Sequence, residues 1–392
     1  MSAKSSPCVI VGLSGGVDSA VAALLLKEKG FDVQGLYMSN WDEDDAYCTA
    51  AQDFQDARAV ARELKIPLHR ASFAAEYRAR VFEYFLAEHR AGRTPNPDVL
   101  CNREVKFGVA LRHARRLGGE WFATGHYARL VRGPGGVEVH RAHDAMKDQT
   151  YFLCAVESWQ LERTLMPVGE LAKQQVRERA RSAGLPVFDK PDSTGICFIG
   201  ERPFREFLAR FLPESPGPIE SLEGLPLGLH RGLAFYTIGQ REGLEIGGRR
   251  DSGGEPWYVA AKDAARNALI VVQGRDHPRL AQTELVTGPF NWLAPPLACA
   301  RHCTVRVRHR QRLEPALVEP AREGAMRIRF EEPQRAVTAG QYAVVYEGTR
   351  CLGGGVIEQV MPDIIPPAAP ATRSDAALGA GPTCAEPLRR RS

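Results

Sequence analysis

The chain has 392 residues, which is enough for two or three domains. Its apolar fraction of 44% and charged fraction of 25% are typical of a folded globular protein and exclude disordered, collagenous and coiled-coil chains. A net charge of +4 does not by itself indicate a nucleic-acid partner. The sequence has no run of about 18 apolar residues and no signal-peptide layout, so we expect a cytoplasmic protein without a membrane segment.

The nine cysteines are dispersed along the chain without regular spacing. An odd, scattered set of cysteines is not a disulfide framework. In a reducing compartment, a cysteine in an unusual sequence setting is more often catalytic or metal-binding than structural. The one close pair, Cys299 and Cys303, is a weak zinc signal and is interpreted as two positions on a strand. We therefore predict no bound structural metal.

Residues 8–125 alternate between short apolar segments typical of buried strands and amphipathic segments typical of helices. Gly30 lies where a helix-ending glycine belongs. The alternation predicts an α/β fold with a doubly wound parallel sheet, which binds its ligands at the carboxyl ends of the strands. The predicted strands are 8–13, 32–38, 68–73 and 120–124, and the predicted helices are 18–29, 50–65, 75–89 and 102–117.

The pattern changes after residue 130. A glycine-rich turn at 131–137 predicts a hairpin, and helices are expected at 148–163, 171–183 and 204–211. Beyond the proline cluster at 213–218 the chain is glycine-rich and strand-like, and beyond 277–278 it alternates in the manner of a small β-barrel. We predict an N-terminal domain over 1–212, a central β-rich domain over 213–279, a C-terminal β-barrel over 280–362, and a disordered Ala/Pro/Gly-rich tail over 363–392.

The strongest local signal is Gly12-Leu-Ser-Gly-Gly-Val-Asp-Ser19, between the first strand and the first helix. A Gly-Gly turn lets backbone N–H groups converge on an anion, and the helix N-terminus adds partial positive charge. Ser14 and Ser19 can add hydroxyl donors, and Asp18 can help to hold Mg²⁺. The spacing differs from the Walker loop and from the dinucleotide-binding glycine pattern. It resembles the pyrophosphate loop of the N-type ATP pyrophosphatases.

Two cysteines lie in unusual segments. Cys101 follows Thr94-Pro-Asn-Pro-Asp-Val-Leu, where the next helix is expected to begin, and a helix N-terminus stabilises a thiolate. Asp98, in the same loop, can accept a proton or hold a substrate N–H. Cys197 lies in Asp192-Ser-Thr-Gly-Ile-Cys-Phe-Ile-Gly200, a glycine-containing loop ahead of a helix. An isolated cysteine is more often a small buried apolar residue, but these polar, constrained settings favour chemistry.

Together with Ala-Thr-Gly-His-Tyr, Lys-Asp-Gln-Thr-Tyr-Phe-Leu, Tyr-Thr-Ile-Gly-Gln-Arg-Glu-Gly and Cys-Leu-Gly-Gly-Gly, these motifs resemble the bacterial tRNA-specific 2-thiouridylases from about Cys8 to Met361. The resemblance implies ATP-dependent thiolation of the wobble uridine of tRNA, with Mg²⁺, in Lys, Glu and Gln tRNAs. A sulfur carrier or cysteine desulfurase would deliver the persulfide. The target base must leave the anticodon stack to be modified.

The resemblance also implies residue roles. Asn96, Pro97 and Asp98 would hold the target base, Cys197 would carry the persulfide, and Cys101 would be the nucleophile. Either the persulfide attacks uracil C2 and Cys101 then frees the sulfur as a Cys101–Cys197 disulfide forms, or hydrosulfide is released first and attacks. The residues implied to bind ATP are Gly12, Leu13, Ser14, Gly15, Gly16, Val17, Asp18, Ser19, Met38 and Gly125.

An acid-free basic segment at 301–312 contains five arginines. Arg306, Arg308 and Arg310 alternate, so we expect them to line one face of a strand and bind RNA phosphates, although a solvated strand face is the alternative. His126 taken alone would be a hydrogen-bonded structural histidine. The residues implied by the resemblance to contact tRNA are His126, Lys147, Asp148, Gln149, Arg308, His309 and Gln341.

Three other functions remain open at this point. An amide-forming ATP pyrophosphatase would not need the paired cysteines, and a tRNA-binding protein without catalysis would release no pyrophosphate. Enzymes that thiolate other tRNA bases commonly carry cysteine clusters for iron–sulfur or zinc. The cysteines here are too far apart in sequence to indicate such a cluster.

Overall fold

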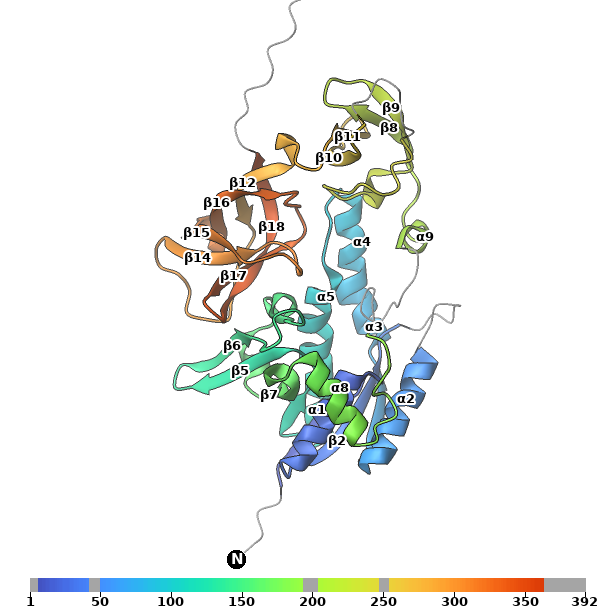
Figure 1. The fold of residues 1–392 in the computed structure, drawn as a ribbon, viewed down its shortest axis with the longest axis vertical. Helices are drawn as coiled ribbons and strands as arrows, with labels where there is room; N and C mark the ends of the chain where they lie inside the picture. The colour runs from blue at the N-terminus through green and yellow to red at the C-terminus, as the bar shows by residue number, and fades with distance from the viewer. Residues whose placement is uncertain (1–5, 42–49, 193–203, 247–253, 363–392) are drawn as a thin grey trace, which may run out of the picture.

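The computed structural model describes residues 6–41, 50–192, 204–246 and 254–362. Figure 1 shows an α/β part built mainly from the first half of the chain, a small β-rich part towards which helix α4 extends, and a barrel beside both. In these described residues no helix is long and apolar enough to cross a membrane. The predicted disorder of the tail at 363–392 and the loop around Cys197 lie outside the described residues.

A five-stranded parallel sheet in the order β3-β2-β1-β4-β7 forms the centre of the α/β part. Val9, Ile10 and Val11 of the central strand are fully buried, as expected for a β-branched run covered on both faces. The strands are β1 (Cys8–Gly12), β2 (Asp32–Ser39), β3 (Leu68–Ser72), β4 (Trp121–Ala123) and β7 (Thr164–Leu165).

Helices cover both faces of this sheet, which confirms the doubly wound fold. One face packs on Val9 and Val11 and the other on Ile10 and Phe122. The helices on the face of Val9 and Val11 are α1 (Val17–Glu28), α2 (Ala50–Leu64) and α8 (Lys173–Ser182). The helices on the face of Ile10 and Phe122 are α3 (Ala74–Tyr77), η1 (Arg78–Phe82), α4 (Glu83–Arg90), α5 (Pro97–Leu100), η2 (Cys101–Ala110) and α6 (Leu111–Arg116). Of these, η1 and η2 are π-helical.

The helix predicted over 148–163 is wrong. The chain forms a 3-10 turn, η3 (Thr150–Leu153), and a short helix, α7 (Ser158–Leu161), with irregular backbone between them. The Asp148 carboxylate accepts hydrogen bonds from the backbone N–H of Ala142 and of Thr150, at 3.2 and 3.3 Å. These local side-chain-to-backbone contacts hold the start of the segment in a turn rather than a regular helix, despite its sequence periodicity.

The central part is a four-stranded sheet in the order β10-β11-β8-β9. Its residues are β8 (Gly217–Ser221), β9 (Pro226–His230), β10 (Trp257–Asp263) and β11 (Ala268–Gln273), preceded by α9 (Phe204–Ala209), with η5 (Leu233–Phe235) between β9 and β10.

The C-terminal part is a barrel of six strands, because β12 pairs with β18 and closes the order β12-β16-β15-β14-β17-β18. The short strand β13 (Asn291–Trp292) pairs with β18, and the hairpin of β5 (Ala128–Gly133) and β6 (Gly136–Arg141) extends the same sheet beyond β18. The predicted hairpin is thus confirmed and belongs to the barrel sheet. The barrel strands are β12 (Ala281–Thr287), β14 (Arg301–Arg306), β15 (Glu314–Pro320), β16 (Met326–Arg335), β17 (Tyr342–Glu347) and β18 (Arg350–Pro362).

His89 on α4 is buried against the central part. Its Nδ1 lies 3.0 Å from the carbonyl oxygen of Ala234 in η5. Burial, assisted by the charge of Lys262, lowers the pKa of His89 to about 4, although the Ala234 carbonyl acts in the opposite direction. The folded protein therefore keeps this histidine neutral in the pH range where the unfolded chain takes up a proton.

We expect acidification from pH 6.5 to pH 4 to destabilise the fold through His89. The unfolded state binds the extra proton in this window, so the free energy of unfolding falls with pH, by up to roughly 3 kcal/mol. Denaturant unfolding of wild type and His89→Asn between pH 4.5 and 7.5 measures the effect, and the variant should show a flatter pH dependence. The exposed His302 provides the control, since His302→Asn should keep the wild-type slope. Equal slopes for His89→Asn and wild type would contradict the prediction.

Candidate active site

The predicted phosphate loop connects the end of β1 to the start of α1. Gly16 is the N-cap of α1 and has no side chain to accept from the first backbone N–H groups of the helix. Ser19 Oγ lies 3.2 Å from Ser14 Oγ and donates to the carbonyl of Gly16 at 3.0 Å, so both hydroxyls lie at the helix start. Backbone donors, hydroxyl groups and the helix dipole together form an anion site.

Glycines let other segments approach this loop closely. Gly15 has φ +79°, and a Cβ there would lie 2.3 Å from the carbonyl oxygen of Asp53 on α2. A Cβ on Gly125 would lie 2.6 Å from the backbone nitrogen of Ser19. The structure therefore places Gly125 against the loop.

The other residues implied to bind ATP contribute in different ways. Leu13 and Val17 are buried in the core under α1, so only their backbone atoms face the loop region. Met38, at the end of β2, is 9% exposed, and a Cβ on Gly12 would lie 3.3 Å from its methyl carbon. Met38 thus packs at the base of the loop, at the carboxyl edge of the sheet.

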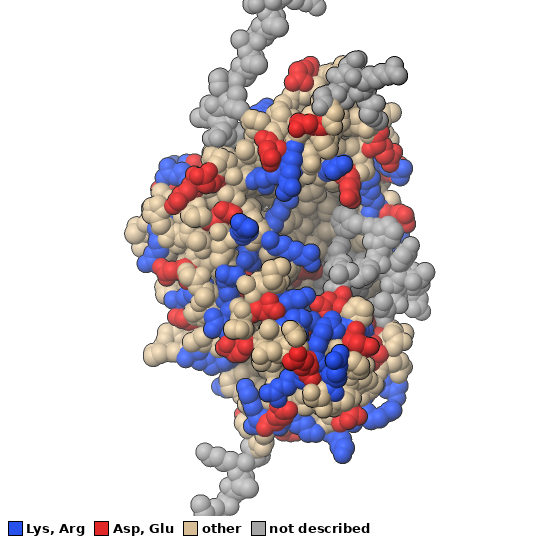
Figure 2. Space-filling model, viewed as in Figure 1, with Lys and Arg blue, Asp and Glu red and all other residues tan. Residues whose placement is uncertain are grey.

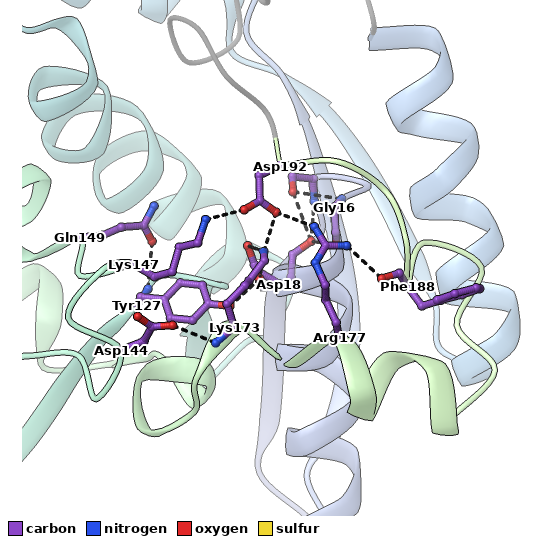
Figure 3. Close-up of polar contacts among 12 residues, drawn as sticks. Gly16, Asp18, Tyr127, Asp144, Lys147, Gln149, Lys173, Arg177, Phe188 and Asp192 are labelled. Atoms are coloured by element: carbon purple, nitrogen blue, oxygen red, sulfur yellow. Dashed lines mark hydrogen bonds and ion pairs between the residues drawn. The ribbon is translucent and has the colours of Figure 1, made fainter. Parts of the chain in front are cut away.

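A cluster of ion pairs surrounds Asp18 (Figure 3). Lys173, the first residue of α8, donates to both carboxylate oxygens of Asp18, at 2.7 and 2.9 Å, and lies 2.7 Å from Asp192 Oδ1. Lys147 and Arg177 also pair with Asp192, at 2.6 and 3.1 Å. Three cations and two carboxylates therefore lie beside the phosphate loop, with a net charge that suits a polyanionic ligand.

The surroundings of these groups set their protonation. Partial burial acts to raise the pKa of Asp192, but hydrogen bonds from Lys147 and Lys173 outweigh it and lower the pKa to about 2. Tyr127 donates its phenol O–H to Asp18 at 2.8 Å. Burial, together with the charge of Asp18, raises the pKa of Tyr127. Asp192 is thus held as an anion among cations at neutral pH.

Sequence reasoning missed Lys173, Tyr127 and Lys190 as site residues. Lys190 donates to the carbonyl of Gly15 at 3.1 Å and pairs with Asp53 at 2.7 Å, so it joins α2 to the phosphate loop. One signal was available for Lys173, because a lysine at the first helical position is opposed by the helix dipole and needs another reason to be there.

The donor set fits ATP and gives limited support for Mg²⁺. Backbone N–H groups at Gly16 and the ammonium of Lys173 suit phosphate oxygens. Among the described residues, no group of three or more His, Cys, Asp or Glu side chains is placed to hold a metal ion. Asp18 is the acidic residue in the first turn of α1 and would be a single protein ligand, which is usual for Mg²⁺ held largely by phosphates and water.

The helix containing Cys101 begins earlier than predicted. Asn96 is the N-cap and accepts from the backbone N–H of Val99, and Pro97 occupies the first helical position. Cys101 therefore lies one turn inside the helix, not at its start, and it is fully buried rather than set in a polar loop. Asp98 lies in the first turn of α5. The expected stabilisation of a thiolate by the first N–H groups is correspondingly reduced.

From Cys101 the helix continues with π-helical pairing through η2. Gln160 supports it by donating from Nε2 to the carbonyls of Arg103 and Phe107, both at 3.0 Å. Asn102 donates to the carbonyl of Phe152 at 3.0 Å. π-Helical turns need such extra partners and are frequent at functional sites. Cys197, the second predicted catalytic residue, lies outside the described residues.

The predicted arginine face is wrong in its geometry. β14 ends at Arg306, whose side chain is 6% exposed and pairs with Asp148 at 3.2 Å. Arg308 follows the strand and donates to the carbonyl of Ala336 at 2.7 Å, and burial lowers its pKa. Only Arg310 of the three is exposed. A buried carboxylate and a turn carbonyl compete for these guanidinium groups, which sequence alternation does not reveal.

The remaining residues implied to contact tRNA differ in exposure. His126 is buried, lies 2.8 Å from Thr124 Oγ1 through Nδ1, and has its pKa lowered by burial, in agreement with the structural alternative. The carboxylate of Asp148 is fully buried. His309 lies 3.2 Å from the Asp148 carbonyl and its ring lies 4.2 Å from that of Phe152.

Two of these residues connect to other parts of the site. Gln149 accepts from the backbone N–H of Tyr127 at 2.9 Å, and Lys147 pairs with Asp192, so both join the cluster beside Asp18. Figure 2 shows Lys and Arg side chains along the hollow at the centre of this face of the molecule. Gln341 of the barrel donates to the carbonyl of Thr94, ahead of the Cys101 helix.

The doubly wound sheet, the glycine turn before α1 and the following two β-rich parts define an α/β protein of the HUP-domain class with a C-terminal barrel. Residues 7–201 match the "tRNA methyl transferase HUP domain" family, residues 205–273 the corresponding PRC-barrel domain, and residues 282–357 the "aminomethyltransferase beta-barrel domain".

The tRNA-specific 2-thiouridylase of Idiomarina loihiensis is 52% identical over 92% of this chain and 98% of its own length. That of Marinobacter nauticus is 54% identical over 91% of this chain and 92% of its own. The chain belongs to the tRNA-specific 2-thiouridylase family. A 4-thiouridine synthetase solved with RNA and ATP is 18% identical, with a TM-score of 0.33, over 52% of this chain and 50% of that one.

Proposed function

We propose that the protein catalyses ATP-dependent 2-thiolation of the wobble uridine of tRNA. The observation that carries this proposal is the relationship, at 52–54% identity over about nine-tenths of the chain, to proteins named for this activity. The anion site at Gly16 and the cations around Asp18 support the assignment of ATP to this edge of the sheet.

In the first half-reaction the C2 oxygen of the uracil attacks the α-phosphorus of ATP and releases pyrophosphate. The N-terminus of α1 and Lys173 would bind the phosphates, and Asp18 would supply a carboxylate to Mg²⁺. Asn96, Pro97 and Asp98, at the start of α5, would hold the base. The C2 oxygen then leaves as part of AMP in the second half-reaction.

In the second half-reaction sulfur arrives at C2 from a persulfide on Cys197. In one order the terminal persulfide sulfur attacks C2 and expels AMP. The Cys101 thiolate then attacks Cys197 sulfur, so the C2-bound sulfur leaves with the electron pair and a Cys101–Cys197 disulfide forms. In the other order Cys101 releases hydrosulfide first, and this attacks C2. Both orders need a cellular thiol reductant to return the disulfide to two thiols.

The proposed partners follow from this chemistry. A cytoplasmic sulfur carrier or cysteine desulfurase would transfer a persulfide to Cys197, and the substrates would be Lys, Glu and Gln tRNAs. Lys147, Asp148, Gln149, Arg308 and His309 would act at the tRNA side of the site, together with His126. The hollow bordered by basic side chains in Figure 2 has the charge expected for a surface that binds RNA.

Nucleoside mass spectrometry tests the proposal directly. Purified protein, ATP, Mg²⁺, a persulfide donor and unmodified tRNA should yield 2-thiouridine at the wobble position. Omission of ATP is the control for the adenylation step. Pyrophosphate release without any thiolated nucleoside, with a competent donor present, would contradict thiolation.

We expect the salt dependence of tRNA binding to depend more on Arg310 than on Arg308. Arg310 is exposed, whereas Arg308 already donates to three protein acceptors. Arg310→Ala should reduce the slope of log K against log salt by about 1, and Arg308→Ala should change the slope less while lowering the melting temperature. Fluorescence anisotropy with labelled tRNA at several salt concentrations measures both. The reverse order of effects would show that Arg308 is the phosphate contact.

A further inference from the structure

The barrel contacts the chain that leads into the Cys101 helix. The backbone N–H of Thr94 donates to the carbonyl of Ala339 at 2.9 Å. The side-chain amide of Gln341 donates to the carbonyl of Thr94 at 2.8 Å and to that of Pro95 at 3.4 Å. The turn between β16 and β17, residues 336–341, thus binds the backbone of the 94–98 segment on both its donor and its acceptor side.

The contact is close enough to require glycine. Gly340 has φ +93°, and a Cβ there would lie 2.9 Å from the nitrogen and carbonyl carbon of Thr94. A side chain at Gly340 would therefore be strained in its own backbone and would also displace Thr94. The fit between turn 336–341 and the 94–98 segment is backbone against backbone.

Arg308 holds the same turn and joins it to the central part. One guanidinium nitrogen of Arg308 donates to the carbonyls of Ala336 and Ile238 and to Thr338 Oγ1. Thr94 Oγ1 lies 3.3 Å from Thr237 Oγ1. All three parts of the molecule therefore meet at the 94–98 segment.

The 94–98 segment is conformationally restricted, so a displacement at one end is passed on to the other. Pro95 and Pro97 fix two of its backbone angles, and Asn96 caps α5 through the N–H of Val99. A displacement at Thr94 therefore moves the start of the helix that carries Asp98 and Cys101. Small displacements of groups that hold a reacting base lower reaction rates strongly.

We propose that Gln341 and Gly340 are positioning residues, which act on the reaction by holding the 94–98 segment in its active conformation. This inference rests on the proposed function, which assigns the target base to that segment. It gives Gln341 a role through Thr94 and Pro95 rather than through direct contact with tRNA. It also makes the barrel part of the machinery that aligns the base.

The test compares two side-chain amides of the barrel, those of Gln341 and Asn291, which both donate to carbonyls of the α/β part. Gln341→Met removes the two hydrogen bonds to Thr94 and Pro95. The matched control is Asn291→Leu, because Asn291 on β13 also joins the barrel to the α/β part through two carbonyls, those of Cys154 and Val156, at 2.8 and 2.9 Å. For each protein one measures the melting temperature, tRNA affinity, single-turnover pyrophosphate release at saturating tRNA and ATP, and hydrogen exchange over 94–101.

Gln341→Met should lower the single-turnover rate about 10-fold and speed hydrogen exchange over 94–101 about 10-fold, as the loss of one or two hydrogen bonds predicts. Its tRNA affinity should stay within about 2-fold of wild type, and Asn291→Leu should change neither rate nor exchange in that segment. Gly340→Ala should show the same pattern with a larger loss of rate.

Three results would overturn the proposal. Weaker tRNA binding with an unchanged rate at saturation would make Gln341 a direct tRNA contact. Equal losses for Gln341→Met and Asn291→Leu would indicate general docking of the barrel, and unchanged exchange over 94–101 would show that the turn does not hold the segment. A wild-type protein that releases no pyrophosphate with tRNA would contradict the proposed function instead, and the exchange measurement would still decide the positioning role.

Discussion

Cys101→Ser is expected to lower 2-thiouridine formation at least about 10³-fold while tRNA-dependent pyrophosphate release continues in a single turnover. A serine hydroxyl is a poor nucleophile towards a persulfide, so sulfur would not be freed. Adenylation of the uracil oxygen does not use the thiol. The variant therefore separates the two half-reactions.

The change is small in volume, but Cys101 is fully buried, so its effect on folding must be measured. Cys154→Ser and Cys303→Ser are matched controls. Burial raises the pKa of both thiols, which makes them poor thiolates, and both substitutions should leave thiolation close to wild type. A folded Cys101→Ser protein that thiolates tRNA at the wild-type rate would remove Cys101 from the reaction.

Lys173→Met is expected to lower the rate of pyrophosphate release about 10²- to 10³-fold, which is the loss typical for removal of one charge-stabilising group from an active site. Lys173 lies between Asp18 and Asp192 at the phosphate loop. Its removal would leave two carboxylates beside the incoming polyphosphate without their shared cation. ATP binding should also weaken.

The control for this substitution lies on the same helix. Arg179→Met removes an exposed ion pair of α8 with Glu28 and should change neither the rate nor ATP affinity. Lys173→Arg tests whether a cation alone suffices, and partial activity is expected because a guanidinium has a different shape. A stable Lys173→Met protein with normal pyrophosphate release would show that Lys173 only stabilises the loop.

Much of the α/β part could be predicted because its signals are local. A β-branched run before a Gly-Gly turn and a helix start is enough to place the loop from Gly12 to Ser19, and the glycine at residue 30 ends α1 as expected, with φ +82°. Both predictions depend only on neighbouring residues along the chain, so tertiary contacts do not have to be known.

Two of the errors, the buried Arg306 and the missed Lys173, originate in contacts between residues distant in sequence. Asp148 pairs with Arg306, 158 residues away, and this contact buries an arginine expected on an exposed face. Lys173 reaches Asp18 across 155 residues. The cap formed by Asn96 is the exception, because Asn-Pro is a local helix-start signal from which the beginning of α5 could have been placed four residues before Cys101.

The hairpin of β5 and β6 has a consequence for synthesis of the chain. β6 pairs with β18, His140 lies 2.9 Å from Thr349, and these two residues are 209 positions apart. At translation rates of about 5–20 residues per second, the edge of β6 stays unpaired for roughly 10–40 s, until its partner strand β18 has been synthesised. During that time an unpaired strand edge is open to other nascent chains, and a fragment ending near residue 212 would keep it permanently. The α/β part is therefore expected to be soluble on its own only when that edge is covered.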